Sequence, residues 1–196
     1  MIRTKRALAL PALLMAAAIG LGACSDSGDK PPASAAFTAQ PAAGPHNQAD
    51  VDYGVAMFPH RVQTLQLADL ALARTKNEKV KAIANEAKDG TSKEVATFGA
   101  YLTGWKTPVP SGADGHSGGP EGVLSKQEIT ALENAPEAQF DKLWLTAMIK
   151  HNQGAVKVSQ TLISAGQNPS NKQLAESIVT KESAEIKTIQ DALSSI

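Results

Sequence analysis

Two Met-x-x-His motifs are the part of this 196-residue chain whose residue types and spacing could do chemistry. Met57 precedes His60 by three positions, and Met148 precedes His151 by the same interval. Residues three apart lie on one face of an α-helix, so each motif would present a thioether beside an imidazole. Such donors suit Cu(I), Ag(I) or Cu(II) and serve Mg²⁺ or Ca²⁺ poorly. Two methionines and two histidines would complete a four-coordinate shell.

The same residues also have a simpler interpretation. Methionine is a common core filler, and a single histidine on a helix is often a hydrogen-bonded interior residue. Glu94 and Glu185 also have two interpretations. They are either acceptors that orient a ligand histidine through its N–H or solvated carboxylates on a helix face. His46 and His116 fall in segments rich in Pro, Gly and Ser, where ordinary exposure is the simpler expectation.

An internal repeat relates the two motifs. Residues 50–102 align with residues 141–193 at a constant offset of 91 and without a gap. The alignment pairs Met57 with Met148, His60 with His151, and Glu94 with Glu185. A repeat sets the fold before other signals do. Each half is therefore expected to form one helical hairpin with an apolar face, and the two hairpins would cover each other and bring the four motif residues together.

Apolar spacing predicts four long helices, over about residues 50–74, 77–105 and 136–165, and from 169 onward. Pro59 predicts a kink or local break in the first helix, and Gly90 and Gly99 weaken the second. The third is expected to stop at Gly166. The fold class expected is all-α, a four-helix bundle with approximate two-fold symmetry, built from two duplicated hairpins.

Two capping patterns mark helix starts. Ser125 and Glu128 form a capping-box pattern, which predicts a short extra helix in the long connection between the hairpins. Asn168 followed by Pro169 opens the last helix, with asparagine as the cap and proline in the first turn.

The N-terminal segment predicts export. Residues 1–23 combine a basic start with a short apolar stretch and read as a cleaved signal peptide. They end in a bacterial lipobox pattern before Cys24, the only cysteine, which is expected to carry a lipid and anchor the protein to the bacterial cell membrane on its extracytoplasmic or periplasmic side. Residues 24–48 are expected to be a flexible tether, because they offer few large apolar residues to bury. The bundle domain is expected over residues 49–196.

Charge and motifs exclude several function classes. The chain has 19 basic and 19 acidic residues, and three of the basic ones lie in the signal peptide, which leaves the mature protein at −3. This balance argues against nucleic acid as a partner. No Glu-x-x-His occurs, so a ferritin-type di-iron site lacks its ligands. No nucleophile motif or phosphate loop is found, and we do not expect an enzyme.

Several short stretches resemble the family called domain of unknown function number 305, a ferritin-like helical family of exported bacterial proteins. The matching stretches are residues 46–51, 57–60, 140–143, 148–151, 154–156 and 166–169, together with the Glu94 and Glu185 positions. Some members bind copper or silver and contribute to metal tolerance, so the resemblance implies extracytoplasmic copper handling. The family usually has a second histidine where this chain has Arg61 and Asn152, and a cationic Arg61 would repel a metal ion.

Two functions are therefore weighed. One is a lipoprotein that binds copper or silver through Met57, His60, Met148 and His151. The other is a non-catalytic envelope bundle that has lost its metal site and acts through contacts with another envelope protein.

Overall fold

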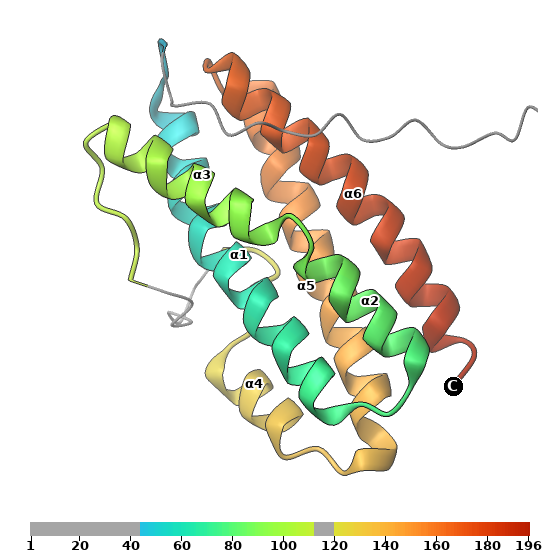
Figure 1. Ribbon diagram of the computed structural model, residues 1–196. Helices are drawn as coiled ribbons and strands as arrows, with labels where there is room; N and C mark the ends of the chain where they lie inside the picture. Colours follow the sequence, from blue (N-terminus) through green and yellow to red (C-terminus); the bar gives the residue numbers. More distant parts are fainter. Residues whose placement is uncertain (1–43, 112–119) are drawn as a thin grey trace, which may run out of the picture. The chain divides into compact units, whose positions relative to one another are not determined.

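The structure, a computed structural model, describes residues 44–111 and 120–196. The expected signal peptide, Cys24, most of the expected tether and His116 lie outside these residues. The described part contains α1 (Gln48–Arg74), α2 (Glu78–Lys88), α3 (Thr91–Gly104), α4 (Lys126–Glu133), α5 (Glu137–Ala165) and α6 (Pro169–Leu193) (Figure 1). The predicted all-α bundle is confirmed, whereas its origin by duplication stays a prediction. None of the described helices is both long and apolar enough to cross a membrane.

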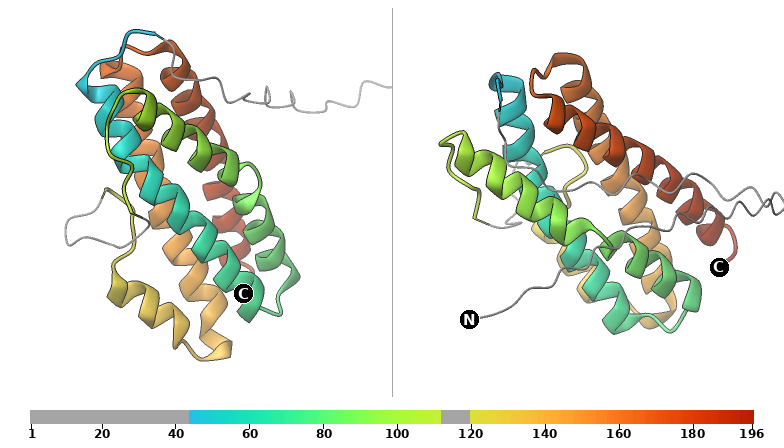
Figure 2. Two further views of the ribbon diagram at one scale, coloured as in Figure 1. Left: turned by 60° about the vertical axis from the view of Figure 1, so that its left-hand side comes forward. Right: turned by 45° about the horizontal axis from the view of Figure 1, so that its top comes forward.

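Helices α1 and α5 pack side by side in opposite directions (Figures 1 and 2). Near the start of α1 the Tyr53 hydroxyl lies 2.8 Å from the Ser159 hydroxyl, near the end of α5. Towards the other end of the bundle, Trp144 of α5 donates its indole N–H to the Leu67 carbonyl at 2.8 Å. Tyr53 and Trp144 are aligned positions of the repeat, so each half contributes one aromatic hydrogen bond between α1 and α5. The central residues of α1 and α5 consequently face one another.

Both predicted capping patterns are confirmed. Ser125 and Glu128 make the reciprocal hydrogen bonds of a capping box at the start of α4, and the Asn168 side chain accepts the Asn171 N–H at the start of α6. A cap of this kind is worth about 1 kcal/mol. The start of α1 was not anticipated: Asn47 and Asp50 form another capping box there, so α1 begins at Gln48, within the range expected to be tether.

The prediction of one continuous second helix over residues 77–105 is wrong. It is divided into α2 and α3 at Asp89 and Gly90, where Gly90 takes a left-handed φ of 75° that glycine adopts without strain. Lys181 of α6 supports the break by donating to the Asp89 carbonyl at 2.8 Å. In the first helix the expected local break is absent, because α1 continues through Pro59.

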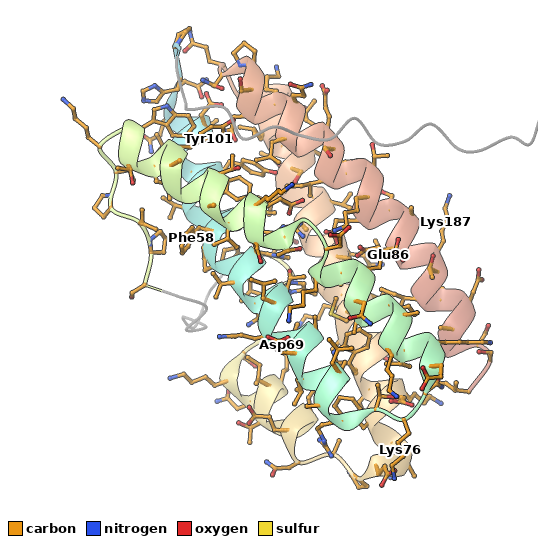
Figure 3. All side chains as sticks on the ribbon, in the orientation of Figure 1. Phe58, Asp69, Lys76, Glu86, Tyr101 and Lys187 are labelled. Carbon is orange, nitrogen blue, oxygen red and sulfur yellow. The ribbon has the colours of Figure 1, made fainter. Side chains whose placement is uncertain are left out.

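The core consists of two apolar clusters. The Tyr101 cluster lies toward the end at which α1 begins, and the Trp144 cluster lies toward the end at which α5 begins; the labelled Tyr101 and Lys76 mark the two ends in Figure 3. The Tyr101 cluster contains Tyr53, Met57, Phe98, Tyr101, Trp105, Ala155, Leu162, Leu174, Ala175 and Ile178. The Trp144 cluster includes Leu67, Val80, Ile83, Leu124, Phe140, Trp144, Leu145, Met148 and Ile189.

Between the two clusters every long helix contributes buried polar residues, which we call the central polar layer. Its members are His60, Arg61, Gln63 and Thr64 of α1, Thr91 and Thr97 of α3, His151 and Asn152 of α5, and Glu182 and Glu185 of α6. Burying so many polar groups is costly unless they bond to one another. Their pairing therefore decides what this part of the bundle can do.

Candidate metal centre in the central polar layer

The two motif histidines meet at the centre of the bundle. The rings of His60 and His151 are stacked with their centroids 3.9 Å apart and their planes 28° from parallel, and neither side chain is exposed. Met57 and Met148 are equally buried, but Met57 belongs to the Tyr101 cluster and Met148 to the Trp144 cluster. The structure thus brings the histidines into contact and places the methionines on opposite sides of them along the bundle.

The two histidines differ in their hydrogen bonds. His151 Nε2 lies 3.0 Å from the Thr64 hydroxyl, and its Nδ1 lies 3.3 Å from the Gly122 carbonyl oxygen. Neither ring nitrogen of His60 has a hydrogen-bond partner among the described residues. Buried polar atoms without a partner are rare in folded proteins. Every other side chain of the layer makes at least one hydrogen bond in the described structure, whereas the side chain of His60 makes none.

Both imidazoles are held in the neutral form. Burial lowers the pKa of His60 well below its usual value, and the nearby His151 and Arg61 lower it further. Burial, followed by the charge of Arg61, lowers the pKa of His151 to about 3. A neutral imidazole has one nitrogen lone pair free to accept a proton donor or a metal ion.

Arg61 is only 1% exposed and forms the ionic part of the layer. Its Nη1 lies 2.5 Å from Glu182 of α6, and its Nε lies 3.3 Å from Glu94 of α3. Burial alone would lower the pKa of Arg61, but Glu182 and Glu94 raise it above its usual value, so the guanidinium remains charged. Two carboxylates face one guanidinium here, and the positive charge of Arg61 is locally compensated.

Asn152 takes the aligned position in the other half. Its side-chain amide donates to Glu185 at 3.0 Å, and Lys181 lies 3.7 Å from the second oxygen of Glu185. Burial, followed by the charge of Glu182, raises the pKa of Glu185 to about 7. The pair Asn152 and Glu185 corresponds through the repeat to Arg61 and Glu94, so the same contact is neutral in one half and ionic in the other.

Glu94 and Glu185 thus bond to the residues that follow the histidines along the helices. Neither has a hydrogen bond to a histidine N–H in the described structure. Sequence reasoning missed the third acid, Glu182, because its aligned position is Thr91 and the repeat gives no signal for it. It also missed that Arg61 is buried. A signal was available: the repeat aligns Arg61 with Asn152 and Glu94 with Glu185, which could have indicated that each residue at the first position bonds to the glutamate of its own half.

A short loop closes over His151, and this contact was not predicted from the sequence. We call residues 121–124 the strap. Gln63 holds the strap by accepting the Leu124 N–H at 2.7 Å and donating to the Leu124 carbonyl at 2.9 Å. Gly154 of α5 lets the strap approach, because a Cβ at this position would lie 2.0 Å from the Glu121 carbonyl oxygen. Glycine is required where two backbones come this close.

Other candidate residues lie away from this layer. His46 is exposed and stacks on Trp105 with the ring centroids 4.8 Å apart. Cys24 and His116 are outside the described residues. Within residues 44–111 and 120–196, no group of three or more His, Cys, Asp or Glu side chains is arranged to hold a metal ion. A metal centre here would therefore depend on the histidine pair and the methionines.

The family described as Domain of unknown function (DUF305) matches residues 50–193. No curated protein matches. Among solved structures, a DUF305 fragment from Deinococcus radiodurans is 26% identical with a TM-score of 0.69, covering 78% of this chain and 100% of the fragment.

CopM in its Cu(II)-bound form is 26% identical to this chain with a TM-score of 0.65, covering 74% of this chain and 96% of CopM. CopM also matches in its Cu(I)-bound and co-crystallised silver-bound forms, each at 24% identity and a TM-score of 0.62. At that identity these two matches show the fold alone.

Proposed function

Because the chain belongs to the DUF305 family, we propose that it is an exported bundle that binds a soft metal ion, copper or silver, for metal handling or tolerance. The ion is its cargo. The proposed ligands are the neutral imidazoles of His60 and His151 with the thioethers of Met57 and Met148. CopM, the relative of similar fold, is known in copper-bound and silver-bound forms.

The observation that carries this proposal is the state of His60. The side chain is fully buried and both of its ring nitrogens lack a partner. An unpartnered buried polar group costs free energy, and a bound ion would recover that cost. Burial keeps the ring unprotonated, so it does not need to lose a proton before it binds a metal.

The charge of Arg61 does not oppose this function as strongly as its position next to His60 suggests. Glu94 and Glu182 both lie against its guanidinium and weaken its repulsion of a cation. The repulsion is not removed, because the charge of Arg61 still lowers the pKa of both His60 and His151. In this proposal Glu94 and Glu185 support the site indirectly, by holding Arg61 and Asn152 beside the histidines.

The proposal extends to the N-terminus. The lipobox pattern before Cys24 supports a lipid anchor in the cell membrane, and the tether would let the bundle stand away from that membrane. Replacing Cys24 with serine should release the full-length protein from membranes. Retention of the variant in the membrane fraction would contradict a lipid anchor at this position.

The test of metal binding is a titration of the mature chain with Cu(I) or Ag(I). Cys24→Ser should be present in every sample, because a free thiol would bind these ions itself. We expect about one equivalent to bind, with about 2.7 kcal/mol of added stability when the free metal exceeds the dissociation constant a hundredfold. His60→Ala and His151→Ala should each abolish the increase in melting temperature. His46→Ala is the matched control, and His116→Ala should also leave it nearly unchanged.

The pH dependence sharpens the test. A metal-binding histidine must be unprotonated, and the pKa of His151 lies at about 3. Binding should therefore persist below pH 6, where an exposed histidine site would already lose its ion. Loss of binding between pH 7 and 6 would place the ligands at exposed histidines instead.

A second function is favoured by one observation. Arg61 and Asn152 occupy the positions of the family's second histidines and are buried and bonded, as expected of a layer that has become structural. In this alternative the protein is a non-catalytic bundle that contacts another envelope protein. It would be preferred if neither the natural chain nor a variant carrying Arg61→His, Asn152→His and Glu182→Gln binds Cu(I), Ag(I) or Cu(II). Glu182→Gln belongs in that variant because Arg61→His removes the cationic partner of Glu182.

A further inference from the structure

The partners of His151 assign the position of its ring proton. The Gly122 carbonyl oxygen can only accept a hydrogen bond, so the contact with Nδ1 requires the proton to be on Nδ1. In a neutral ring Nε2 then carries the lone pair. The Thr64 hydroxyl, 3.0 Å from Nε2, must be the donor in that contact.

The strap keeps the Gly122 carbonyl in place. Gln63 binds the Leu124 backbone through both its amide oxygen and its amide nitrogen. On the other side, Gly122 is packed so closely that an added Cβ would lie 2.7 Å from the Cα of Gly154. The strap is therefore fixed to α1 and α5 at the level of His151, and the proton position on His151 follows from backbone packing.

Thr64 has two acceptors within reach. Besides Nε2 of His151, its hydroxyl lies 3.2 Å from the His60 carbonyl oxygen, one turn earlier on α1. A hydroxyl has a single proton to donate, and threonine commonly bonds to a carbonyl four residues back in a helix. Thr64 can thus release the Nε2 lone pair and remain hydrogen-bonded.

The aligned position explains why His60 differs. The repeat pairs Thr64 of α1 with Ala155 of α5, and Ala155 is fully buried. Ala155 has no hydroxyl, and His60 has no partner for either ring nitrogen. The first half therefore provides a hydroxyl, that of Thr64, to the histidine of the second half. The second half has only the methyl group of Ala155 at the aligned position.

From these contacts we propose that Nε2 is the donor atom of His151 toward a soft metal ion, with the Thr64 hydroxyl as the exchangeable group that occupies its lone pair in the metal-free protein. This inference rests on the proposed function and adds to it. Thr64 is a positioning residue: on metal binding its hydroxyl would turn to the His60 carbonyl, and His60 would bind without any such exchange.

The experiment uses the mature chain with Cys24→Ser and Ag(I) as the probe. Nitrogen-15 NMR of the metal-free protein should show the proton of His151 on Nδ1. Thr64→Val should lower the melting temperature of the metal-free protein, because Nε2 loses its donor, and should raise Ag(I) affinity by up to about tenfold, because no hydrogen bond competes. Thr64→Ser should restore both values.

Two further variants separate this exchange from a general effect on packing. Thr97→Val removes a buried hydroxyl that bonds only to the Lys93 carbonyl, so it should leave Ag(I) affinity unchanged. Because Ala155 is aligned with Thr64 in the repeat, we expect Ala155→Ser to bring a hydroxyl to His60 and to have the opposite effect to Thr64→Val, with a higher melting temperature and severalfold weaker Ag(I) binding. Opposite movements of stability and affinity support the exchange.

Three results would overturn it. A proton on Nε2 of His151 in the metal-free protein contradicts the assignment of the donor atom. Parallel losses of stability and Ag(I) affinity in Thr64→Val, with binding retained in the parent, contradict the exchange and leave the proposed function intact. Absence of Ag(I) binding in the parent and in every variant refutes the proposed function, and the exchange with it.

Discussion

The two halves of the bundle, α1–α3 and α5–α6, fill aligned positions with different chemistry. Arg61 in the first half is a buried cation held by Glu94 and Glu182, whereas Asn152 in the second half is a buried amide held by Glu185. Asp50 is buried and bonded, whereas the aligned Asp141 is half-buried. One backbone framework thus supports an ionic and a neutral version of the same layer, and the ionic half should depend more strongly on its individual residues.

The largest expected effect comes from removing the buried cation. Arg61→Met leaves Glu94 and Glu182 without their partner and should lower the free energy of unfolding by about 3–5 kcal/mol, measured by urea denaturation. Asn152→Ala removes only the amide donor and should cost about 1–3 kcal/mol. Adding Glu182→Gln to Arg61→Met should recover part of the loss. Equal effects of Arg61→Met and Asn152→Ala would contradict the difference between the halves.

The next effect concerns the aligned aspartates. Asp50 accepts the N–H groups of Asn47 and Gln167 and the side-chain amide of Asn171. Burial would raise its pKa, but these hydrogen bonds hold the pKa below the usual value. Asp50→Ala should cost about 2 kcal/mol at pH 7, and this contribution should disappear as the pH falls through the lowered pKa, since protonation then weakens the same bonds. Asp141→Ala, the control, should change stability by no more than about 0.5 kcal/mol.

The aligned glutamates should respond to neutralisation with opposite signs. The pKa of Glu185 is raised to about 7 from a usual value of 4.5, so between these pH values the folded protein holds a proton that the unfolded chain has released. Its contribution to stability therefore falls as pH rises through this window. Glu185→Gln should make the protein more stable than the parent at pH 8 and similar to it at pH 4. Glu94→Gln weakens the ion pair with Arg61 and should destabilise at pH 8.

Thermal unfolding at the two pH values checks this prediction. A loss of stability at pH 8 in both glutamine variants would contradict the raised pKa of Glu185.

The smallest effect concerns the helix starts. Asn47 caps α1, whereas the N-cap position of α5, Pro136, provides no side-chain bond. Asn47→Ala should cost about 1 kcal/mol.

Chains starting at Ser25 and at Gly44 should melt at the same temperature, and one starting at Ala49 should melt several degrees lower. A lower melting temperature for the chain starting at Gly44 than for the chain starting at Ser25 would mean that residues 25–43 contribute to the fold.

Much of the fold could be predicted because its signals are local. Capping residues such as Asn168 act on the N–H groups of the next turn, and the spacing of apolar residues places the long helices within a few positions. The division at Gly90 was missed because glycine weakens a helix without determining where it ends. The Lys181 contact that supports this break lies 92 positions away along the chain.

The candidate site could be predicted only in part, because most of its contacts join residues that are distant along the chain. The repeat pointed to His60 and His151, and the structure places their rings in contact. A charged residue such as Arg61 is usually taken as exposed, because its burial depends on a partner that only the fold supplies. Glu182 is 121 positions away from Arg61, and the strap meets Gly154 only after the bundle has formed.

The stacking of aligned histidines has a consequence for how such a site can change over time. In a homodimer of identical hairpins, any residue beside the symmetry axis would be present twice, and a single substitution to arginine would bury two guanidinium groups face to face. A single chain carrying both hairpins is free of that restriction. It can place one cation at position 61 and an amide at position 152. A single substitution then changes the charge of the centre by one, whereas in a symmetric dimer it would change that charge by two.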